Sequence, residues 1–271
     1  MLLTITHTTD YRFAGPVAHG LQRLRLRPKT TQGQQVIDWT MQLDGATEQV
    51  SYDDHHHNAT SLVSLAAGVE VLSITCSGTV QTSDKIGIIG QHSGYLPLWA
   101  FTAQTALTKP GPKIRALAGK FKPQVTAPLD LLHDLSSAVL AAVSYETGYT
   151  DSTTAAEVAL GAGHGVCQDH AHVFLSAARL LGVPARYVSG YLMMDDRIDQ
   201  DAGHAWVEAH VEGLGWVGFD VSNGISPDAR YVRVATGRDY REAAPITGLS
   251  WGGGDASLSV SLAIQQQMPE Q

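Results

Sequence analysis

A cysteine preceded by two glycines lies in the stretch that decides the fold, residues 163–172, which read GHGVCQDHAH. The apolar segment that follows stops before Gly182 and Pro184, a combination typical of a helix end. The pattern therefore predicts a helix over residues 167–181 that begins at Cys167. Unpaired backbone N–H groups and a partial positive charge at that helix end stabilise a thiolate. They can also bind the oxyanion that forms on an attacked carbonyl.

A thiolate nucleophile needs a partner that holds a proton and delivers it to the leaving amine, and histidine suits this task. The chain has twelve histidines, and His204 is distinguished by its position in GHAWVE, residues 203–208, at the head of a predicted strand. Asp220 ends the next predicted strand, residues 216–220. A carboxylate near an imidazole fixes its tautomer and stabilises its charged form. Cys167, His204 and Asp220 are therefore the candidate catalytic residues.

Each of the three candidates also has a purely structural interpretation. Cys167 could be a small buried apolar residue, as many free cysteines are. His204 could be a strand histidine whose hydrogen bonds are satisfied locally. Asp220 could cap the turn at residues 221–224, which read VSNG.

The expected hairpin brings His204 and Asp220 only partly together. With residues 213–215 as the loop, Glu208 lies opposite Asp220. His204 then lies about 13 Å further along the same face, at about 3.3 Å per residue. A bulge, a strong twist or a different loop length would be needed to join them. Spacing alone therefore does not decide whether Cys167, His204 and Asp220 form one catalytic group.

Strand patterns dominate the first part of the chain. Residues 3–7 and 36–43 alternate between apolar and polar side chains, and Asp44-Gly45 is a turn signal. We interpret residues 1–107 as an N-terminal antiparallel, β-sandwich-like domain. The Pro-, Gly- and Lys-containing segment 108–127 is interpreted as a connection.

Helical spacing replaces the alternation after this connection. One helix is predicted behind Thr126 and Pro128, and a second, short one near residues 152–153, with Glu157 placed as in a capping box. Strands are then predicted at residues 186–193, 205–211, 216–220, 231–235 and 258–264. Helices followed by antiparallel strands make an α+β fold, with residues 128–271 as its core.

Composition limits the classes of function. The 271 residues are 44% hydrophobic and 16% charged, which is typical of a soluble globular protein. A net charge of −8 argues against nucleic acid or an anionic membrane as a partner. The chain has no run of about 20 apolar residues and no charged leader, so neither a membrane span nor a signal peptide is expected. Two cysteines, Cys76 and Cys167, are too few for a disulfide scaffold, and we expect a cytoplasmic protein.

A metal site near the cysteine is not expected. The candidate ligands are His164, Cys167, His170 and His172. On a helix, Cys167 and His170 are about 60° apart and His172 is about 140° from Cys167, so these three side chains do not converge on a zinc ion. The run DDHHHN at residues 53–58 is interpreted as a solvated loop. No cofactor is implied, and no Asp-rich loop supports calcium binding.

Four motifs follow one another along the chain: GVCQD (165–169), LGVPARYVSGY (181–191), GHAWVE (203–208) and GWVGFD (215–220). Three further segments are ITHTTDY (5–11) and QRLRLRP (22–28) in the N-terminal region and VATGRDY (234–240) downstream. The four motifs resemble the core of the transglutaminase-like superfamily, and the further segments are similar to its bacterial members, which carry an N-terminal β-region before that core.

This resemblance implies a papain-like, transglutaminase-like core in which the catalytic cysteine begins a helix and the histidine and aspartate lie on antiparallel strands. It implies Cys167 as nucleophile, His204 as base and then acid, and Asp220 as the residue that orients His204. Two departures stand out. Val221-Ser222 replaces the usual Pro-Thr, and His170 stands where a bulky aromatic residue is common. The backbone N–H of Cys167 is the one oxyanion donor that can be placed.

The resulting functional hypothesis is acyl transfer from peptide or glutamine-type amides through a thioester on Cys167. Hydrolysis, as in a protease or amidase, is favoured. Transfer to an amine, as in a protein-glutamine transglutaminase, is the alternative, and so is a non-catalytic peptide-binding module that keeps the fold. The expected partner is a peptide or protein amide substrate, with no nucleic acid and no membrane, and the oligomeric state stays open.

Overall fold

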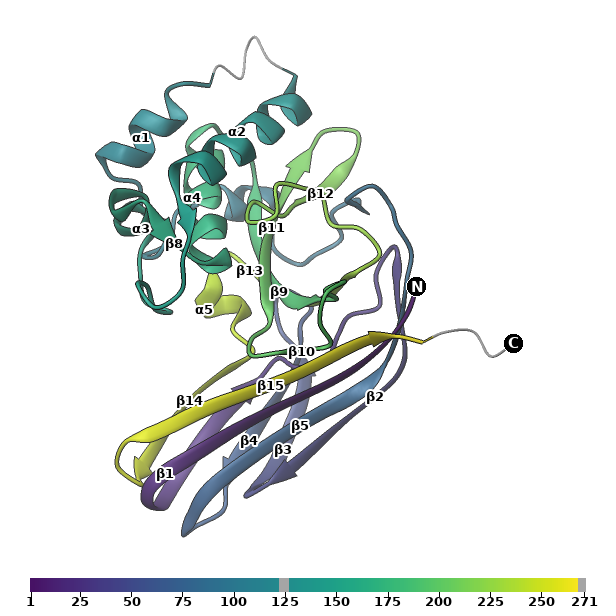
Figure 1. Cartoon of the computed structure of the whole chain (residues 1–271), viewed down its shortest axis with the longest axis vertical. Coiled ribbons are helices and arrows are strands. Elements are labelled where there is room, and N and C mark those ends of the chain that lie inside the picture. The colour runs from purple at the N-terminus through teal and green to yellow at the C-terminus, as the bar shows by residue number, and fades with distance from the viewer. Residues whose placement is uncertain (122–126, 268–271) are drawn as a thin grey trace.

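The computed structural model describes residues 1–121 and 127–267, which form a curled β-sheet and a second region where helices pack on a five-stranded sheet (Figure 1). The strands of the curled sheet are β1 (Leu2–Leu24), β2 (Gln34–Asp44), β3 (Ala46–Asp53), β4 (Ala59–Leu65), β5 (Val69–Thr82), β10 (Asp199–Gln200), β14 (Ile246–Gly252) and β15 (Ala256–Gln266).

The long strand β1 connects the two halves of the curled sheet. Its first half lies between β5 and β15, and its second half between β14 and β4. The ladder to β5 is interrupted between Arg12 and Val17, where β1 turns from one half to the other. Both halves contribute to a shared apolar core that contains Val17, Leu72 and Ile74. The sandwich-like region predicted from sequence is therefore one continuous sheet that curls over itself.

The C-terminal strands belong to this curled sheet. A strand at residues 258–264 was predicted and lies within β15, but β15 pairs with β1 from Leu3↔Gln266 to Phe13↔Ala256. Residues 246–266 thus lie apart from the core sheet, to which the sequence analysis had assigned them. Period-two alternation indicates which face of a strand is buried but not which strand pairs with it, and this explains the difference.

The core sheet has the order β13-β9-β11-β12-β6, and all its pairs are antiparallel. Its strands are β6 (Ile88–Gly90), β9 (Ala185–Leu192), β11 (His204–Val211), β12 (Gly215–Phe219) and β13 (Tyr231–Gly237). The helices are η1 (Leu98–Phe101), α1 (Pro112–Ala118), α2 (Pro128–Ala142), α3 (Ala156–Ala162), α4 (Cys167–Leu180) and α5 (Tyr240–Ala243), and two short strands, β7 (Ser144–Tyr145) and β8 (His164–Gly165), pair in parallel.

Helix α4 is the central element of the core. Val173, Phe174, Ala177 and Ala178 are buried, and the ring of Phe174 stacks on Phe219 of β12. The helix ends at Leu180, and Gly182 has a positive φ of 82°, as the glycine after a helix often does. The helix predicted over residues 167–181 is confirmed, and its packing fixes the position of its first residue.

The segment between the two regions is more structured than the sequence suggested. Strand β6 already pairs with β12, so the N-terminal strands of the curled sheet end at Thr82 and residues 88–90 belong to the core sheet. The expected connection at 108–127 contains helix α1, while its residues 122–126, with the expected helix signal Thr126, lie outside the described residues. Three-residue strands and seven-residue helices are too short for periodicity to identify.

Glu157 stabilises a different helix from the one expected. Helix α3 begins at Ala156, later than the predicted start near residues 152–153. The carboxylate of Glu157 accepts hydrogen bonds from the backbone N–H groups of Gly111, Lys113 and Ile114, at 2.8–3.0 Å. It therefore caps helix α1, whose first-turn donors would otherwise be unpaired.

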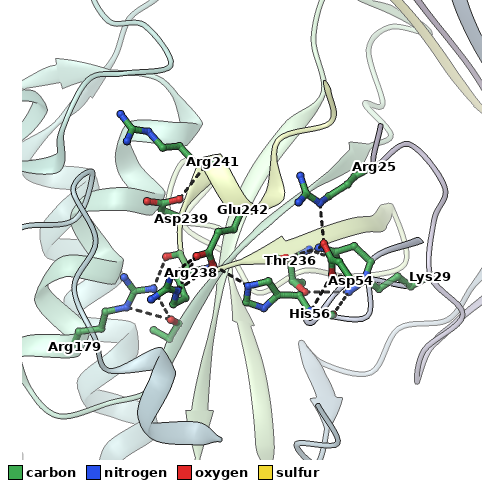
Figure 2. Close-up of polar contacts among 12 residues, drawn as sticks. Arg25, Lys29, Asp54, His56, Arg179, Thr236, Arg238, Asp239, Arg241 and Glu242 are labelled. Carbon is green, nitrogen blue, oxygen red and sulfur yellow. Dashed lines mark hydrogen bonds and ion pairs between the residues drawn. The ribbon is translucent and has the colours of Figure 1, made fainter. Parts of the chain in front are cut away.

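Side chains of the curled sheet dock onto β13, the edge strand of the core sheet. The Gln34 amide bonds both backbone groups of Arg233, at 2.7 and 2.8 Å, and the Asn58 amide does the same for Thr236, at 2.8 Å each. Figure 2 shows a second contact close by, where His56 Nε2 lies 2.8 Å from Glu242 Oε2. These bonds satisfy an otherwise open sheet edge and hold the two regions in one relative position.

None of the described helices is both long and apolar enough to cross a membrane.

Candidate active site

Cys167 is the first residue of α4 and is half-buried, so its thiol remains accessible. As an N-terminal helix residue, its backbone N–H has no acceptor within the helix. Asp169 Oδ2 accepts hydrogen bonds from Val166 N at 2.9 Å and from Thr150 Oγ1 at 2.6 Å. A Cβ on Gly165 would lie 2.7 Å from this carboxylate, so glycine is required there. Asp169 thereby fixes the chain that leads into Cys167.

His204 and Asp220 meet directly. His204 Nε2 lies 2.7 Å from Asp220 Oδ2. The observed register pairs Val211 with Gly215 and Glu208 with Gly218, so the loop is residues 212–214. The predicted register, with Glu208 opposite Asp220, was therefore wrong by two residues. The shift moves Asp220 about 6.6 Å towards His204, at about 3.3 Å per residue, which leaves a diagonal contact that the two side chains can span.

Asp220 is fully buried and accepts two further side-chain hydrogen bonds. Tyr231 Oη donates to Asp220 Oδ2 at 2.6 Å, and Asn223 Nδ2 donates to the same oxygen at 2.7 Å. The backbone N–H of Asn223 donates to the other carboxylate oxygen. Burial raises the pKa of Asp220, but the hydrogen bonds from His204, Tyr231 and Asn223 outweigh burial and lower the pKa below its ordinary value. Asp220 thus both caps the turn and holds His204.

The electrostatics keep His204 protonated at neutral pH. Burial lowers the pKa of His204, but hydrogen bonds to Asp220 and Cys167, and the negative charges of both, raise it to about 10. Because Nε2 is bonded to Asp220, Nδ1 is the ring nitrogen left for the sulfur. The imidazole of His204 and the thiol of Cys167 can therefore share a proton at the N-terminus of helix α4.

The raised pKa of His204 predicts a pH dependence of stability. The folded state binds the His204 proton more tightly than the unfolded state, whose pKa is near 6.5. This stabilisation is complete below pH 6.5 and is lost as the pH rises towards about 10. We expect the difference in unfolding free energy between the wild type and His204→Gln to shrink between pH 6.5 and 9.5 in urea titrations. A difference that stays constant across this range would contradict the proposed charge state.

The two departures from the family pattern contact each other. His170 is fully buried, with Nδ1 2.8 Å from Ser222 Oγ and Nε2 2.8 Å from the carbonyl oxygen of Val143. Because a carbonyl can only accept, His170 Nε2 donates to Val143. The pair joins helix α4, one turn beyond Cys167, to the turn that follows Asp220.

A cavity of about 300 Å³ opens beside Cys167 and His204. Tyr187 of β9 lines it and lies close enough to Cys167 that burial, reinforced by the negative charge of the sulfur, raises the tyrosine pKa well above its ordinary value. Sequence reasoning gave no role to Tyr187, although this residue lies within the motif at residues 181–191, and it missed Tyr231 and Asn223, which tertiary contacts join to the site. The turn signal VSNG at residues 221–224 was the only available indication for Asn223.

His170 and His172, which follow the cysteine on helix α4, each contact protein groups. His172 Nε2 lies 3.2 Å from the backbone N of Tyr240, and burial lowers the pKa of His172 to about 3. In the described part of the chain, ligand atoms of His55, His56 and Glu242 lie within 4.8 Å of one another. The Glu242 carboxylate is already paired with the Arg238 guanidinium, which would repel a cation (Figure 2).

Comparison with known proteins places this fold and site in a family. Residues 115–221 match the family model of the transglutaminase-like superfamily, and residues 3–81 match that of the bacterial transglutaminase-like N-terminal region. The structure is similar to that of a proposed cysteine protease from Cytophaga hutchinsonii, with a TM-score of 0.76 and 22% identity, over 99% of this chain and 92% of the other.

Two mycobacterial relatives align over nearly their whole length. An uncharacterised protein of Mycobacterium leprae is 27% identical over 97% of this chain and 98% of its own. An uncharacterised protein of Mycobacterium tuberculosis is 28% identical over 94% of this chain and 89% of its own.

The fold is a mostly β, transglutaminase-like fold, and this supports a cysteine-based enzyme in general. The chain belongs to the transglutaminase-like superfamily, with the bacterial N-terminal region preceding the core.

Proposed function

We propose that this chain is a cysteine-nucleophile acyl-transfer enzyme that cleaves peptide or glutamine-type amides through a thioester. The observation that carries the proposal is that His204 bonds the buried Asp220 carboxylate and lines the same cavity as Cys167, the first residue of helix α4. Cys167 is the nucleophile, His204 transfers protons, and Asp220 orients His204 and stabilises its charged form.

The first half-reaction forms the thioester. The Cys167 thiolate attacks the carbonyl carbon of the amide, and the backbone N–H of Cys167 donates a hydrogen bond to the oxyanion. The C–N bond then breaks, and the proton held by His204 goes to the nitrogen of the leaving amine or ammonia. The acyl group remains on sulfur, and His204 is left neutral.

The second half-reaction returns the enzyme to its starting state. Neutral His204 takes a proton from water as the oxygen attacks the thioester carbonyl, and the C–S bond breaks to release a carboxylic acid and the thiolate. A primary amine in place of water would give a transamidated product. We favour water, because no Asp or Glu side chain is found among the described residues that line the cavity, so nothing there attracts an ammonium group.

Alkylation of the two cysteines tests the proposal against a non-catalytic peptide-binding module. Cys76 is fully buried, and burial raises its pKa to about 12, so it serves as an internal control. With iodoacetamide at pH 7, we expect Cys167 to react at least about tenfold faster than N-acetylcysteine, because only the thiolate is nucleophilic. Peptide mass mapping identifies the modified residue. Reaction of Cys167 no faster than the free thiol would remove the basis for the enzymatic assignment.

A further inference from the structure

We propose that the curled sheet supplies one wall of the substrate pocket, and that this pocket takes an uncharged, apolar side chain of the acyl donor. The inference rests on the proposed function of Cys167. The cavity beside this residue is lined not only by core residues but also by β1 and β15, whose residues lie far from Cys167 in the sequence.

One face of β1 packs against the core at the start of the strand and lines the cavity further along. Leu3 and Ile5 are fully buried and pack against Tyr191 and Val234 of the core. His7, Thr9 and Tyr11 continue the same face, because side chains alternate with a period of two, and they line the cavity. The strand therefore contacts the core at one end and diverges from it further along, and the cavity occupies the space between.

Strand β15 extends this wall. Val260 lies opposite Thr9 in the ladder, and Leu258 lies opposite Tyr11. Both line the cavity, and Leu258 remains 56% exposed although it is a large apolar side chain. An apolar surface left open beside a candidate nucleophile is a feature expected of a binding site.

Apart from the reacting pair Cys167 and His204, the described residues that line the pocket offer no charged group to a substrate side chain. No Asp, Glu, Lys or Arg is found among the described residues that line it. Burial lowers the pKa of His7 to about 4, so His7 is neutral at pH 7, and its ring nitrogens contact Tyr191 Oη at 2.9 Å and Thr9 Oγ1 at 3.2 Å. A charged side chain would lose its hydration there without gaining an ion-pair partner, which is costly.

The volume and the position of the cavity fit one side chain of a short peptide substrate. The volume of about 300 Å³ is at the lower end of the range for ligand pockets, about 300–1,000 Å³. The wall is not free to drift, because the amide contacts of Gln34 and Asn58 with β13 hold the curled sheet against the core. Figure 2 shows the neighbouring contacts of Lys29 and His56 with Thr236 and Glu242, which act in the same way.

Three thiol-alkylating reagents test the inference: the chloromethyl ketones of N-acetylphenylalanine and N-acetyllysine, and iodoacetamide as a reference without a side chain. For wild-type protein we expect the phenylalanyl reagent to modify Cys167 about 10- to 100-fold faster than the lysyl reagent, after each rate is divided by its rate with N-acetylcysteine. Equal normalised rates would overturn the inference, whereas a Cys167 that does not react faster than N-acetylcysteine with iodoacetamide would overturn the proposed function.

A variant designed to reverse the preference between the phenylalanyl and the lysyl reagent tests the inference more sharply. Val260→Asp adds a carboxylate to the pocket wall, and we expect the lysyl-to-phenylalanyl rate ratio to rise at least about tenfold. Ser259→Asp is the matched control, because Ser259 is the exposed neighbour on the opposite face of β15 and should leave the ratio unchanged. Leu258→Asp repeats the test at a more exposed site, in case the first variant does not fold. The same ratio in all three variants as in wild type would contradict the assignment of this wall.

Discussion

Cys167→Ala is expected to reduce hydrolysis of 4-nitrophenyl acetate by at least about 10³-fold, since loss of a nucleophile removes the covalent route entirely. His204→Ala should cost a similar factor, because without it nothing supplies the proton that the reaction needs. The double variant should be no slower than either single variant, as expected of groups that act as one unit. Release of 4-nitrophenolate is followed at 400 nm or a similar visible wavelength at neutral pH.

Asp220→Ala should retain part of the activity, because Asp220 orients His204 but does not touch the reacting atoms. Cys76→Ala is the control for loss of a thiol that is not among the described residues lining the cavity, and it should hydrolyse the ester as the wild type does. Activity in Cys167→Ala equal to that of Cys76→Ala, with both proteins folded by circular dichroism, would refute the nucleophile assignment.

The second large effect is expected in stability, at Glu208. Its side chain is fully buried and accepts hydrogen bonds from Arg186 and Arg233, the first at 2.6 Å. Burial raises the pKa of Glu208, but the two guanidinium groups outweigh burial and lower it. Glu208→Ala would leave the buried Arg233 and the largely buried Arg186 without their carboxylate, and we expect a loss of about 3–5 kcal/mol in the free energy of unfolding.

Urea denaturation measures this loss, and Glu212→Ala is the matched control, because Glu212 is exposed in the hairpin loop of the same strand pair. Its effect should stay within about 0.5 kcal/mol. Replacing Glu208 by Leu and Arg233 by Met together should cost less than the two single replacements summed, because neither charge is then left unpaired. A loss below about 1 kcal/mol for Glu208→Ala would mean that water or movement relieves the two arginines.

The elements predicted best were those with a strong local signal. Helix α4 was predicted within one residue, because its glycines, its apolar face and the Gly182 stop all lie in one continuous segment. The strands β9, β11, β12 and β13 were also found where the alternation or apolar runs placed them. The start and end of such a helix or strand depend on residues that are neighbours in the sequence, so one sequence is enough to predict them.

Features that depend on pairing were not predictable in this way. The hairpin register was wrong by two residues because Gly215, expected as the last residue of the loop, already pairs with Val211 as the first residue of β12. The partners of Asp220 include Tyr231, which belongs to a strand that is not its neighbour in the sheet. The cavity wall at His7 and Thr9 lies more than 150 residues from Cys167 along the chain, and no local pattern indicates such a contact.

The pairing of β1 with β15 has a consequence for biosynthesis. Phe13 pairs with Ala256, which is synthesised roughly 10–50 s later than Phe13 at about 5–20 residues per second. During this interval one hydrogen-bonding edge of β1 is open and able to recruit another nascent chain. The cavity wall that faces the sulfur is complete only after β15 has been synthesised. Polypeptides released before β15 would therefore have an incomplete cavity wall and an unpaired edge on β1, and we expect chaperones to bind them.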